Sequence, residues 1–314
     1  MIFSSVYTIL YAFARHDGSL DEDAMRRQVR ACLASGAHGI AILGLTTEVA
    51  RLTGDERRAI IAWTAEEIAG RVPLAATVAG PDIDSQIAFA RDAAKLGARW
   101  LVFQPPENCN DERELLQAFG RAADAVDVPF GIQNAPQFLG VGLSAASISA
   151  LHRNHSNFTV LKREAPATEI EQVVEACGET LSVLNGRGGL ELTDILRAGC
   201  GGIIPAPECC DIQVRIYNAM ARGDDLLADE LHRRLVVAID AEAGSAGFEG
   251  FRFLAHAQMN GGTREGVGDF AGVDLLGIKE RFDGFFELVL AGEQEAEVIV
   301  GTIMAGSYLH NLAQ

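Results

Sequence analysis

The stretch 73-PLAATVAGPDIDSQIAFARDAAKLGARWLVFQ-104 contains one complete strand–helix–strand unit. Residues 73–78 and 100–104 are short, nearly continuous apolar runs, which is typical of strands that are buried on both faces. Between them, residues 83–97 carry apolar side chains at helical spacing and end on a glycine, where helices often stop. Strands that are joined through a helix run parallel, so this stretch predicts a parallel sheet.

The same alternation recurs over much of the chain. Short apolar runs, most of them followed by an amphipathic stretch, occupy residues 7–13, 39–43, 73–78, 100–104, 129–133, 159–162, 181–184 and 202–204. A capping box, Thr53-x-x-Glu56, opens one of the helices. Eight strand–helix units are the number that closes a (β/α)8 TIM barrel, which we predict for residues 1–222. A doubly wound open sheet is the alternative, although no G-x-G-x-x-G motif follows the first strand.

The strand signal gives way to successive helical patterns from about residue 208. We therefore predict a C-terminal helical layer over residues 223–314. The segment after Glu293 is a candidate assembly element.

Composition limits the classes of partner. The chain has 314 residues, 48% of them hydrophobic, and a net charge of −17, which argues against nucleic acid and anionic membrane surfaces. Its six cysteines have neither metal-site nor disulfide spacing, so we expect free thiols in a reducing compartment. The N-terminus does not resemble a signal peptide, and no uncharged run reaches transmembrane length. We expect a cytoplasmic protein that acts on a small molecule.

The stretch 158-FTVLKREAP-166 places a lysine at the end of a predicted buried strand. Arginine supplies most of the positive charge, and the lysines are Lys95, Lys162 and Lys279. The carboxyl ends of barrel strands form the active-site face, where a desolvated, neutral Lys162 could attack a carbonyl to form a Schiff base. The alternative is a lysine that reaches the rim or pairs with Glu164. Lys95 and Lys279 lie in helical patterns and are expected at the surface.

A threonine-containing turn follows the second predicted strand. Gly44, Thr46, Thr47 and Glu48 lie after the second strand, where backbone N–H groups and hydroxyls could cradle a carboxylate. Glu48 is expected to brace this loop rather than to move protons.

Amide side chains end the fifth and seventh strands. Gln133 and Asn134 end the fifth strand and are expected to place two amides in the barrel mouth beside Lys162. Structural caps are the alternative for both. Asn185 and Gly186 end the seventh strand and are predicted to line the same mouth.

The histidines do not form pairs at strand ends, so no metal site is predicted. They are His16, His38, His152, His155, His232, His256 and His310. His152 and His155 have i,i+3 spacing, but we place them in a polar loop before the sixth strand with a helix-end or surface role.

Together, the threonine turn, the x-N-x-P turn and the strand-ending lysine resemble the dihydrodipicolinate synthase / N-acetylneuraminate lyase superfamily, from about residue 5 to about residue 220. The resemblance implies a TIM barrel, a homotetramer or homodimer, and Schiff-base chemistry on a 2-oxo acid without a metal or organic cofactor. By this resemblance Lys162 is the Schiff-base lysine, and Thr46 belongs to the carboxylate-binding turn.

Several positions depart from the dihydrodipicolinate synthases. Leu45 replaces the first threonine of their G-T-T-G-E turn, Gln133 replaces the tyrosine of their Y-N-x-P turn, and 105-PPEN-108 replaces P-P-Y-Y. The arginine that usually follows the Y-N-x-P turn is replaced near Phe138. A glutamine amide cannot donate and recover a proton as a phenol does.

The 2-keto-3-deoxy-L-arabonate dehydratase branch is closer in its motifs. It carries a Q-D-A-P turn and a K-x-E-x-P segment, which 133-QNAP-136 and 162-KREAP-166 resemble. Asn134 replaces the aspartate of that turn.

The sequence therefore predicts a Schiff-base lyase that acts on a 2-keto-3-deoxy sugar acid, by dehydration or by aldol cleavage. Its predicted catalytic residues are Lys162, which forms the covalent imine, and Gln133. The predicted substrate-binding residues are Gly44, Thr46, Thr47, Asn134, Glu164, Asn185 and Gly186. Pyruvate condensation of the dihydrodipicolinate synthase type, a non-catalytic 2-oxo acid binding protein and a barrel with unrelated, metal-assisted chemistry are the alternatives.

Overall fold

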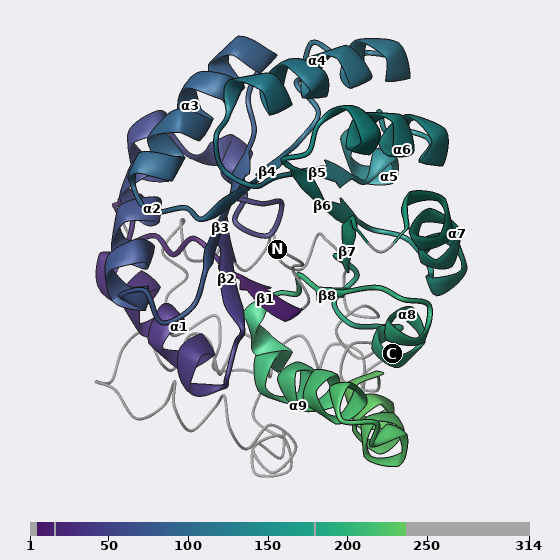
Figure 1. The fold of residues 1–314 in the computed structure, drawn as a ribbon. Helices are drawn as coiled ribbons and strands as arrows, with labels where there is room; N and C mark the ends of the chain where they lie inside the picture. Colours follow the sequence, from purple (N-terminus) through teal and green to yellow (C-terminus); the bar gives the residue numbers. More distant parts are fainter. Residues whose placement is uncertain (1–4, 16, 179, 237–314) are drawn as a thin grey trace, which may run out of the picture.

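The fold is a closed barrel of eight parallel strands, in sequence order around the ring (Figure 1). The structure is a computed structural model that describes residues 5–15, 17–178 and 180–236. The strands are β1 (Ser5–Ile9), β2 (Gly39–Ile42), β3 (Leu74–Val78), β4 (Trp100–Phe103), β5 (Phe130–Asn134), β6 (Phe158–Arg163), β7 (Ser182–Asn185) and β8 (Gly202–Ile203). The predicted TIM barrel is confirmed, and the open doubly wound sheet is wrong because β8 pairs with β1.

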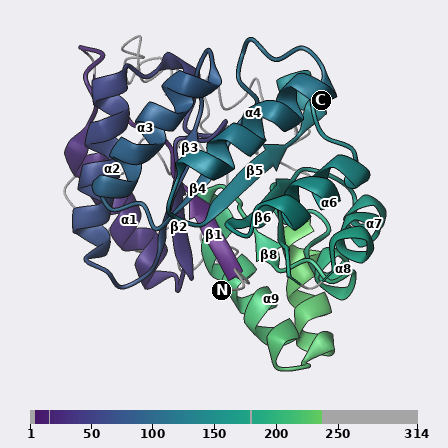
Figure 2. The same ribbon diagram turned by 45° about the horizontal axis from the view of Figure 1, so that its top comes forward.

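Helices form a ring outside the strands (Figures 1 and 2). They are α1 (Glu22–Ala34), α2 (Gly54–Ile68), α3 (Ile83–Lys95), α4 (Glu112–Ala125), α5 (Pro136–Leu139), α6 (Ala145–Asn154), α7 (Ala167–Cys177), α8 (Leu192–Arg197) and α9 (Cys210–Ala221), with short 3-10 turns η1 (Val49–Arg51) and η2 (Pro207–Cys209). The capping box of Thr53 and Glu56 is confirmed at the start of α2.

Two predictions about local structure need correction. The first strand was expected over residues 7–13, but β1 ends at Ile9, and both backbone groups of Tyr11 bond the side chain of Gln28 in α1. His152 was placed in a loop, but it lies in the last turn of α6. Its ring nitrogens lie 2.8 Å from Phe158 O and 2.8 Å from Thr180 Oγ1, which fits the predicted helix-end role.

Some predictions fall on residues outside the described part of the chain. These are Lys279, the histidines His16, His256 and His310, the segment after Glu293 and most of the C-terminal helical layer. Residues 225–236 are helical, as predicted for the start of that layer. Lys95 is the last residue of α3 and is exposed, as expected.

The barrel interior below its mouth is apolar. Alternate strand residues point inward, and the inward set forms its own cluster, which consists of Tyr7, Ile9, Ala41, Ala75, Trp100, Val102, Val160, Leu184 and Ile204. Tyr7 packs edge-on against Trp100 with ring centroids 5.1 Å apart, and burial raises the pKa of Tyr7 to about 12. Any polar side chain above this cluster therefore rests on an apolar floor.

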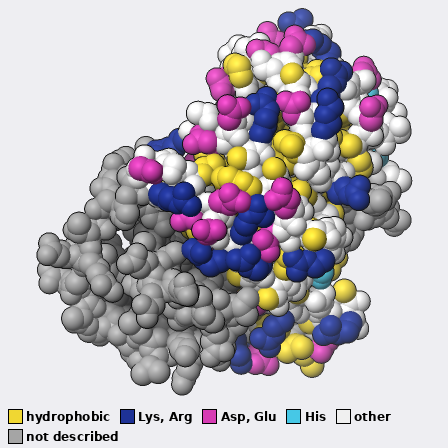
Figure 3. Space-filling model, turned by 90° about the vertical axis from the view of Figure 1, so that its left-hand side faces the viewer, with side chains coloured by type: hydrophobic (Ala, Val, Ile, Leu, Met, Phe, Trp, Pro, Cys, Tyr) yellow, Lys and Arg dark blue, Asp and Glu magenta, His cyan; other side chains and the backbone are white. Residues whose placement is uncertain are grey.

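The side of the molecule that carries α1, α2 and α3 has interleaved acidic and basic side chains (Figure 3). Arginines supply the cations: Arg26 lies 2.7 Å from Glu66, and Arg58 lies 3.1 Å from Asp92. Exposed pairs of this kind contribute little stability individually. Among the described residues, no helix is long and apolar enough to cross a membrane.

Close contacts seal the seam between β1 and β8. A Cβ on Gly202 would lie 1.9 Å from Ser5 O, so only glycine lets the two backbones approach. Thr8 Oγ1 donates to Cys210 Sγ at 3.1 Å, and the Tyr11 hydroxyl donates to Glu208 Oε2 at 2.8 Å. Burial raises the pKa of the Glu208 carboxyl above its ordinary value, although the Tyr11 hydrogen bond partly opposes this.

We predict that Gly202→Ala lowers the free energy of unfolding by about 3 kcal/mol, because the new methyl group meets backbone that cannot move without opening the barrel. Gly120→Ala is the matched control: it lies within α4, and its Cβ would meet His155 Nε2 at an ordinary 3.5 Å. This change should raise stability by roughly 0.5–1 kcal/mol. Urea unfolding of both variants checks the pair, and equal effects would contradict the role of Gly202.

We also predict that Glu208→Gln stabilises the protein more in mildly alkaline than in mildly acid buffer. In the unfolded chain Glu208 loses its proton above its ordinary pKa of 4.5, whereas in the folded protein it keeps the proton because burial raises its pKa. Between these two pKa values folding takes up a proton, so the stability of the wild type falls as pH rises. The glutamine still accepts the Tyr11 hydrogen bond but does not titrate. The stability gap should widen by about 1 kcal/mol or more. Thermal unfolding across the pH range measures it, and a pH-independent gap would contradict the assignment.

Candidate active site

Lys162 lies at the carboxyl end of β6 and points into the barrel. Its partners in register are Gln133 of β5 and Leu184 of β7. Val160, two residues earlier, belongs to the apolar interior cluster, so Lys162 faces the same way, directly above it. Only 4% of Lys162 is exposed. The strand therefore delivers an amine to the floor of the mouth, as predicted.

The partner of Lys162 is Glu164. Lys162 Nζ lies 3.3 Å from Glu164 Oε1, and the two side chains are only 5% and 9% exposed. A buried ammonium is costly without a counter-charge, so this pair lets the lysine remain inside. Lys162 therefore pairs with Glu164, as the alternative interpretation proposed. The same lysine also lies at the barrel mouth, where it could react with a substrate.

Two glutamines continue the polar chain across neighbouring strands. Gln133 Nε2 donates to Glu164 Oε1 at 2.6 Å, and Gln104 Nε2 donates to Gln133 Oε1 at 2.9 Å. Gln133 is fully buried and Gln104 is 5% exposed. Four side chains from the ends of β4, β5 and β6 thus form one connected network that ends at Lys162 Nζ.

Gly186 makes room for Glu164. A Cβ on Gly186 would lie 2.7 Å from Glu164 Cγ and 2.8 Å from its Oε1. The backbone N–H of Gly186 donates to Arg163 O at 3.0 Å, which holds it against the end of β6. On the other side, Gln137 Nε2 donates to Glu164 O at 2.6 Å. Gly186, predicted to bind substrate, therefore determines where Glu164 can lie.

Asn134 was expected to place an amide in the mouth, with a structural cap as the alternative, and Asn185 was expected to line the mouth, but the amides of both bond backbone groups instead. The Asn134 side chain donates to Leu143 O at 2.8 Å and accepts from Leu143 N at 2.9 Å. Asn185 donates to Ala165 O at 2.7 Å and accepts from Arg187 N at 2.8 Å. Because successive strand residues face opposite sides, Gln133 and Asn134 cannot both point inward. Both asparagines fix loops at the barrel rim.

The threonine turn has two different hydroxyls. Thr47 is buried and donates to Leu10 O at 2.7 Å, so it ties the turn to β1. Thr46 is half-buried, and within the described chain no acceptor is found for its hydroxyl or its N–H. Glu48 Oε1 lies 3.6 Å from Arg51 Nε, which fits the bracing role expected of it. Thr46 is therefore the threonine that remains available to a ligand.

Strained backbone flanks this turn. Leu43 and Glu48 have φ of 62° and 53°, a conformation that costs energy for residues other than glycine. A Cβ on Gly44 would lie 2.3 Å from Ile9 Cδ1, so Gly44 allows the turn to sit against β1. Strain of this kind is concentrated at ligand-binding turns.

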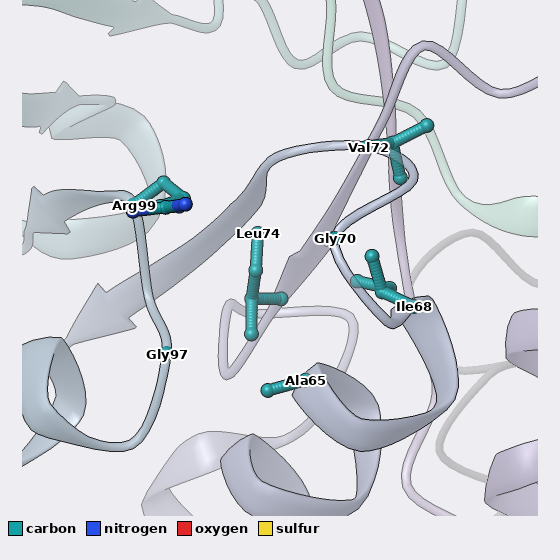
Figure 4. Close-up of a pocket in the computed structure, with 7 residues that line it drawn as sticks. All are labelled: Ala65, Ile68, Gly70, Val72, Leu74, Gly97 and Arg99. Carbon is teal, nitrogen blue, oxygen red and sulfur yellow. The ribbon is translucent and has the colours of Figure 1, made fainter.

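A cleft lies at the opposite end of the barrel (Figure 4). It is lined by Ala65, Ile68, Gly70, Val72, Leu74, Gly97 and Arg99. Leu74 begins β3 and Arg99 precedes β4, so the cleft belongs to the amino-terminal face. Barrel enzymes carry their chemistry on the other face, and this cleft contains no carboxylate or nucleophile.

Within the described ranges, no three His, Cys, Asp or Glu side chains are grouped to hold a metal ion. All six cysteines are free, as expected, and four of them are buried. Absence of a cofactor stays a prediction.

Sequence reasoning missed Gln104, Tyr11 and Glu208. Gln104 could have been found, because Trp100 and Val102 point inward and the next residue with the same parity is Gln104. Tyr11 lies in the loop after β1 and Glu208 in the 3-10 turn η2 after β8, and no spacing rule joins these two positions.

Comparison with known proteins agrees with this geometry. The sequence profile described as the dihydrodipicolinate synthetase family matches residues 2–248. A 4-hydroxy-tetrahydrodipicolinate synthase of Pelobacter propionicus is 27% identical over 75% of this chain and 81% of its own. The enzyme of that name from Limosilactobacillus fermentum is 30% identical over 70% of this chain and 71% of its own.

A solved structure shares the fold. YagE, a prophage protein of E. coli K12 from the dihydrodipicolinic acid synthase family, in complex with pyruvate, superposes with a TM-score of 0.76 at 22% identity, over 81% of this chain and 88% of its own. With a buried lysine at the end of β6 and a profile match over most of its length, the chain belongs to the dihydrodipicolinate synthetase family, a family of Schiff-base lyases.

Proposed function

We propose that this protein forms a Schiff base between Lys162 and a 2-oxo acid, and that its substrate is a 2-keto-3-deoxy sugar acid. The observation that carries the proposal is the buried contact of 3.3 Å between Lys162 Nζ and Glu164 Oε1 at the mouth of the barrel. An amine needs a proton acceptor beside it to become a nucleophile, and Glu164 is placed to be that acceptor.

Imine formation follows from this pair. Glu164 takes a proton from the Lys162 ammonium, and the neutral amine attacks C2 of the 2-oxo acid to give a carbinolamine. Loss of the C2 hydroxyl as water, with a proton returned by Glu164, leaves the iminium. The Thr46 turn is suited to hold the substrate carboxylate through its N–H and hydroxyl groups.

The next proton transfer needs a base near C3. The iminium draws electrons from the C3–H bond, and Glu164, again a carboxylate, can take that proton to give an enamine. If C4 carries a hydroxyl, the enamine expels it, with a proton from an acid such as Glu164, and hydrolysis of the resulting imine releases the dehydrated product. If the C3–C4 bond of the iminium breaks instead, with the C4 hydroxyl proton passing to a base such as Glu164, a carbonyl product leaves from C4 and the enamine remains on Lys162, which is a retro-aldol cleavage.

Glu164 thus takes the role that the tyrosine of the Y-N-x-P turn has in the similar synthases. Gln133, which occupies that position, has no acidic proton to transfer. Its amide donates to Glu164 and accepts from Gln104. We infer that Gln133 acts by orienting Glu164. This difference favours a sugar-acid lyase, as does the resemblance of 133-QNAP-136 and 162-KREAP-166 to the arabonate dehydratase branch.

Pyruvate condensation is the second candidate. The relatives that are 27% and 30% identical carry the name 4-hydroxy-tetrahydrodipicolinate synthase. Both candidates begin with the same imine on Lys162. A cytoplasmic location and a homotetramer or homodimer stay predictions.

We predict that borohydride reduces a covalent adduct on Lys162 when pyruvate or a 2-keto-3-deoxy sugar acid is present. Lys162→Ala should abolish the adduct and lower turnover by about 10³-fold or more, because it removes the amine that forms the imine. Lys95→Ala, at the exposed end of α3, is the control and should leave both unchanged. Intact mass and peptide mapping locate the adduct. Labelling of wild type elsewhere, or nowhere, would overturn the Schiff-base assignment.

We predict that Glu164→Gln still forms the adduct, at a reduced rate, but loses proton transfer at C3. Pyruvate bound as an imine exchanges its methyl protons with D2O, and proton NMR measures the rate. The exchange should fall by about 10²- to 10⁴-fold, the usual contribution of a general base. Glu169→Gln is a suitable control, because Glu169 pairs with Arg163 outside the barrel. Exchange at the wild-type rate in Glu164→Gln would assign the base to another group.

A further inference from the structure

We propose that Gln104 is a positioning residue that helps to set the direction of the Gln133 amide and thereby fixes which oxygen of Glu164 exchanges protons with the substrate. The inference rests on the proposed function, in which Glu164 is the base. Within the described chain, the Gln104 side chain bonds Gln133 rather than Lys162 or Glu164, so it acts through Gln133.

The direction of the hydrogen bonds is the first step. An ionised carboxylate only accepts hydrogen bonds, so Gln133 must turn its NH2 group toward Glu164. Its carbonyl oxygen then faces Gln104, which must in turn present its own NH2 group. A carboxamide alone has no preference between its two ends. The donor of Gln104 therefore adds to the preference that the Glu164 carboxylate imposes, and it keeps Gln133 in this orientation after Glu164 has taken up a proton.

Gln104 is held firmly enough to do this. Its backbone N–H donates to Val78 O at 2.9 Å, which continues the sheet one residue past β4. Its carbonyl oxygen accepts from Gln86 Nε2 at 3.3 Å, and the same nitrogen lies 3.3 Å from Gly80 O. Backbone ties to β3 and α3 thus fix the position from which the Gln104 side chain reaches Gln133.

The two oxygens of Glu164 are consequently unequal. Oε1 lies 2.6 Å from Gln133 Nε2 and 3.3 Å from Lys162 Nζ, and both of these groups donate. A proton placed on Oε1 would compete with both donors. For Oε2, no partner is found among the residues that the structure describes. We infer that Oε2 is the oxygen that takes and returns the C3 proton, while Oε1 exchanges a proton only with Lys162 during imine formation and otherwise accepts from Gln133.

The charge beside Glu164 acts in the same direction as the Gln133 donor. Within the described part of the chain, Lys162 is the cation paired with Glu164, and it contacts Oε1 as well. Arg163 points outward to Asn134 O and Glu169, and Arg187, which follows Gly186, pairs with Glu191 at 2.8 Å. The neighbours from β5 and α5, Gln133 and Gln137, are neutral.

Removal of the Gln104 donor should let the Gln133 amide rotate. Its carbonyl would then face Glu164, an arrangement that is stable only when Glu164 carries a proton and can donate it. The carboxylate form, which is the base, would become populated only at higher pH. If Gln104 sets this orientation, its replacement should shift the pH profile of proton exchange. A general loosening of the barrel would slow the exchange without shifting the profile.

Two variants of Gln104, each of nearly unchanged size, test whether its NH2 group sets the orientation of the Gln133 amide. Gln104→Met removes the donor, whereas Gln104→Glu replaces it by an acceptor that forces the NH2 group of Gln133 away from Glu164. Gln28→Met is the matched control, because Gln28 is a buried glutamine whose amide bonds the backbone of Tyr11, at α1.

The experiment measures deuterium exchange into the methyl group of pyruvate across a pH range, with borohydride trapping on the same samples. In Gln104→Met, the midpoint of the acid limb should rise by about one pH unit, and exchange below it should fall about tenfold, as expected for one hydrogen bond. Gln104→Glu should shift the limb further. Gln28→Met should keep the wild-type midpoint, and all four proteins should trap pyruvate on Lys162.

Each outcome decides a separate point. Wild-type midpoints in both Gln104 variants, with trapping intact, would overturn the positioning role and leave the Schiff-base function standing. A slower exchange without any shift of the midpoint would do the same, because it is what general loosening produces. Absence of trapping in wild type would overturn the proposed function, and the role of Gln104 with it.

Discussion

The arrangement of the barrel mouth depends on one buried ion pair, between Lys162 and Glu164. The interior below Lys162 is apolar, so its ammonium can remain there only with a counter-charge at 3.3 Å. Glu164 in turn needs donors, which Gln133 supplies, and space, which Gly186 leaves free. The residues around the pair are thus determined by the cost of burying charge as much as by any substrate.

The regular parts of the fold were predictable because each rests on a local period. Apolar runs and helical spacing located all eight strands, and the closed barrel followed from their number. The end of β1 was not predictable, because the apolar side chains of residues 10–13 continue the pattern while Gln28 captures the backbone of Tyr11. Side-chain capture of this kind joins positions that are distant in sequence and leaves no periodic signal.

Site residues were predictable where the residue type and its place in a motif already indicate the chemistry. Lys162 was identified from its position, and Glu164 from its neighbouring motif, but the inward or outward direction of strand-end amides was not weighed. Parity along β4 and β5 selects Gln104 and Gln133 and excludes Asn134, whose amide caps Leu143 instead. The close approach of Gly186 to Glu164 could not be predicted from the sequence, because the two residues follow different strands, β7 and β6.

The absent side chain at Gly186 has a consequence for how this mouth can change over time. A Cβ there would lie within 3 Å of three atoms of Glu164, so a larger residue at 186 is compatible only with a shorter one at 164. The two positions are therefore constrained to vary as a pair. Among relatives, a glutamate aligned with Glu164 should coincide with a glycine aligned with Gly186, and chains that carry a larger residue at 186 should have lost the glutamate. This pairing offers a way to divide the family by proton-transfer chemistry from sequence alone.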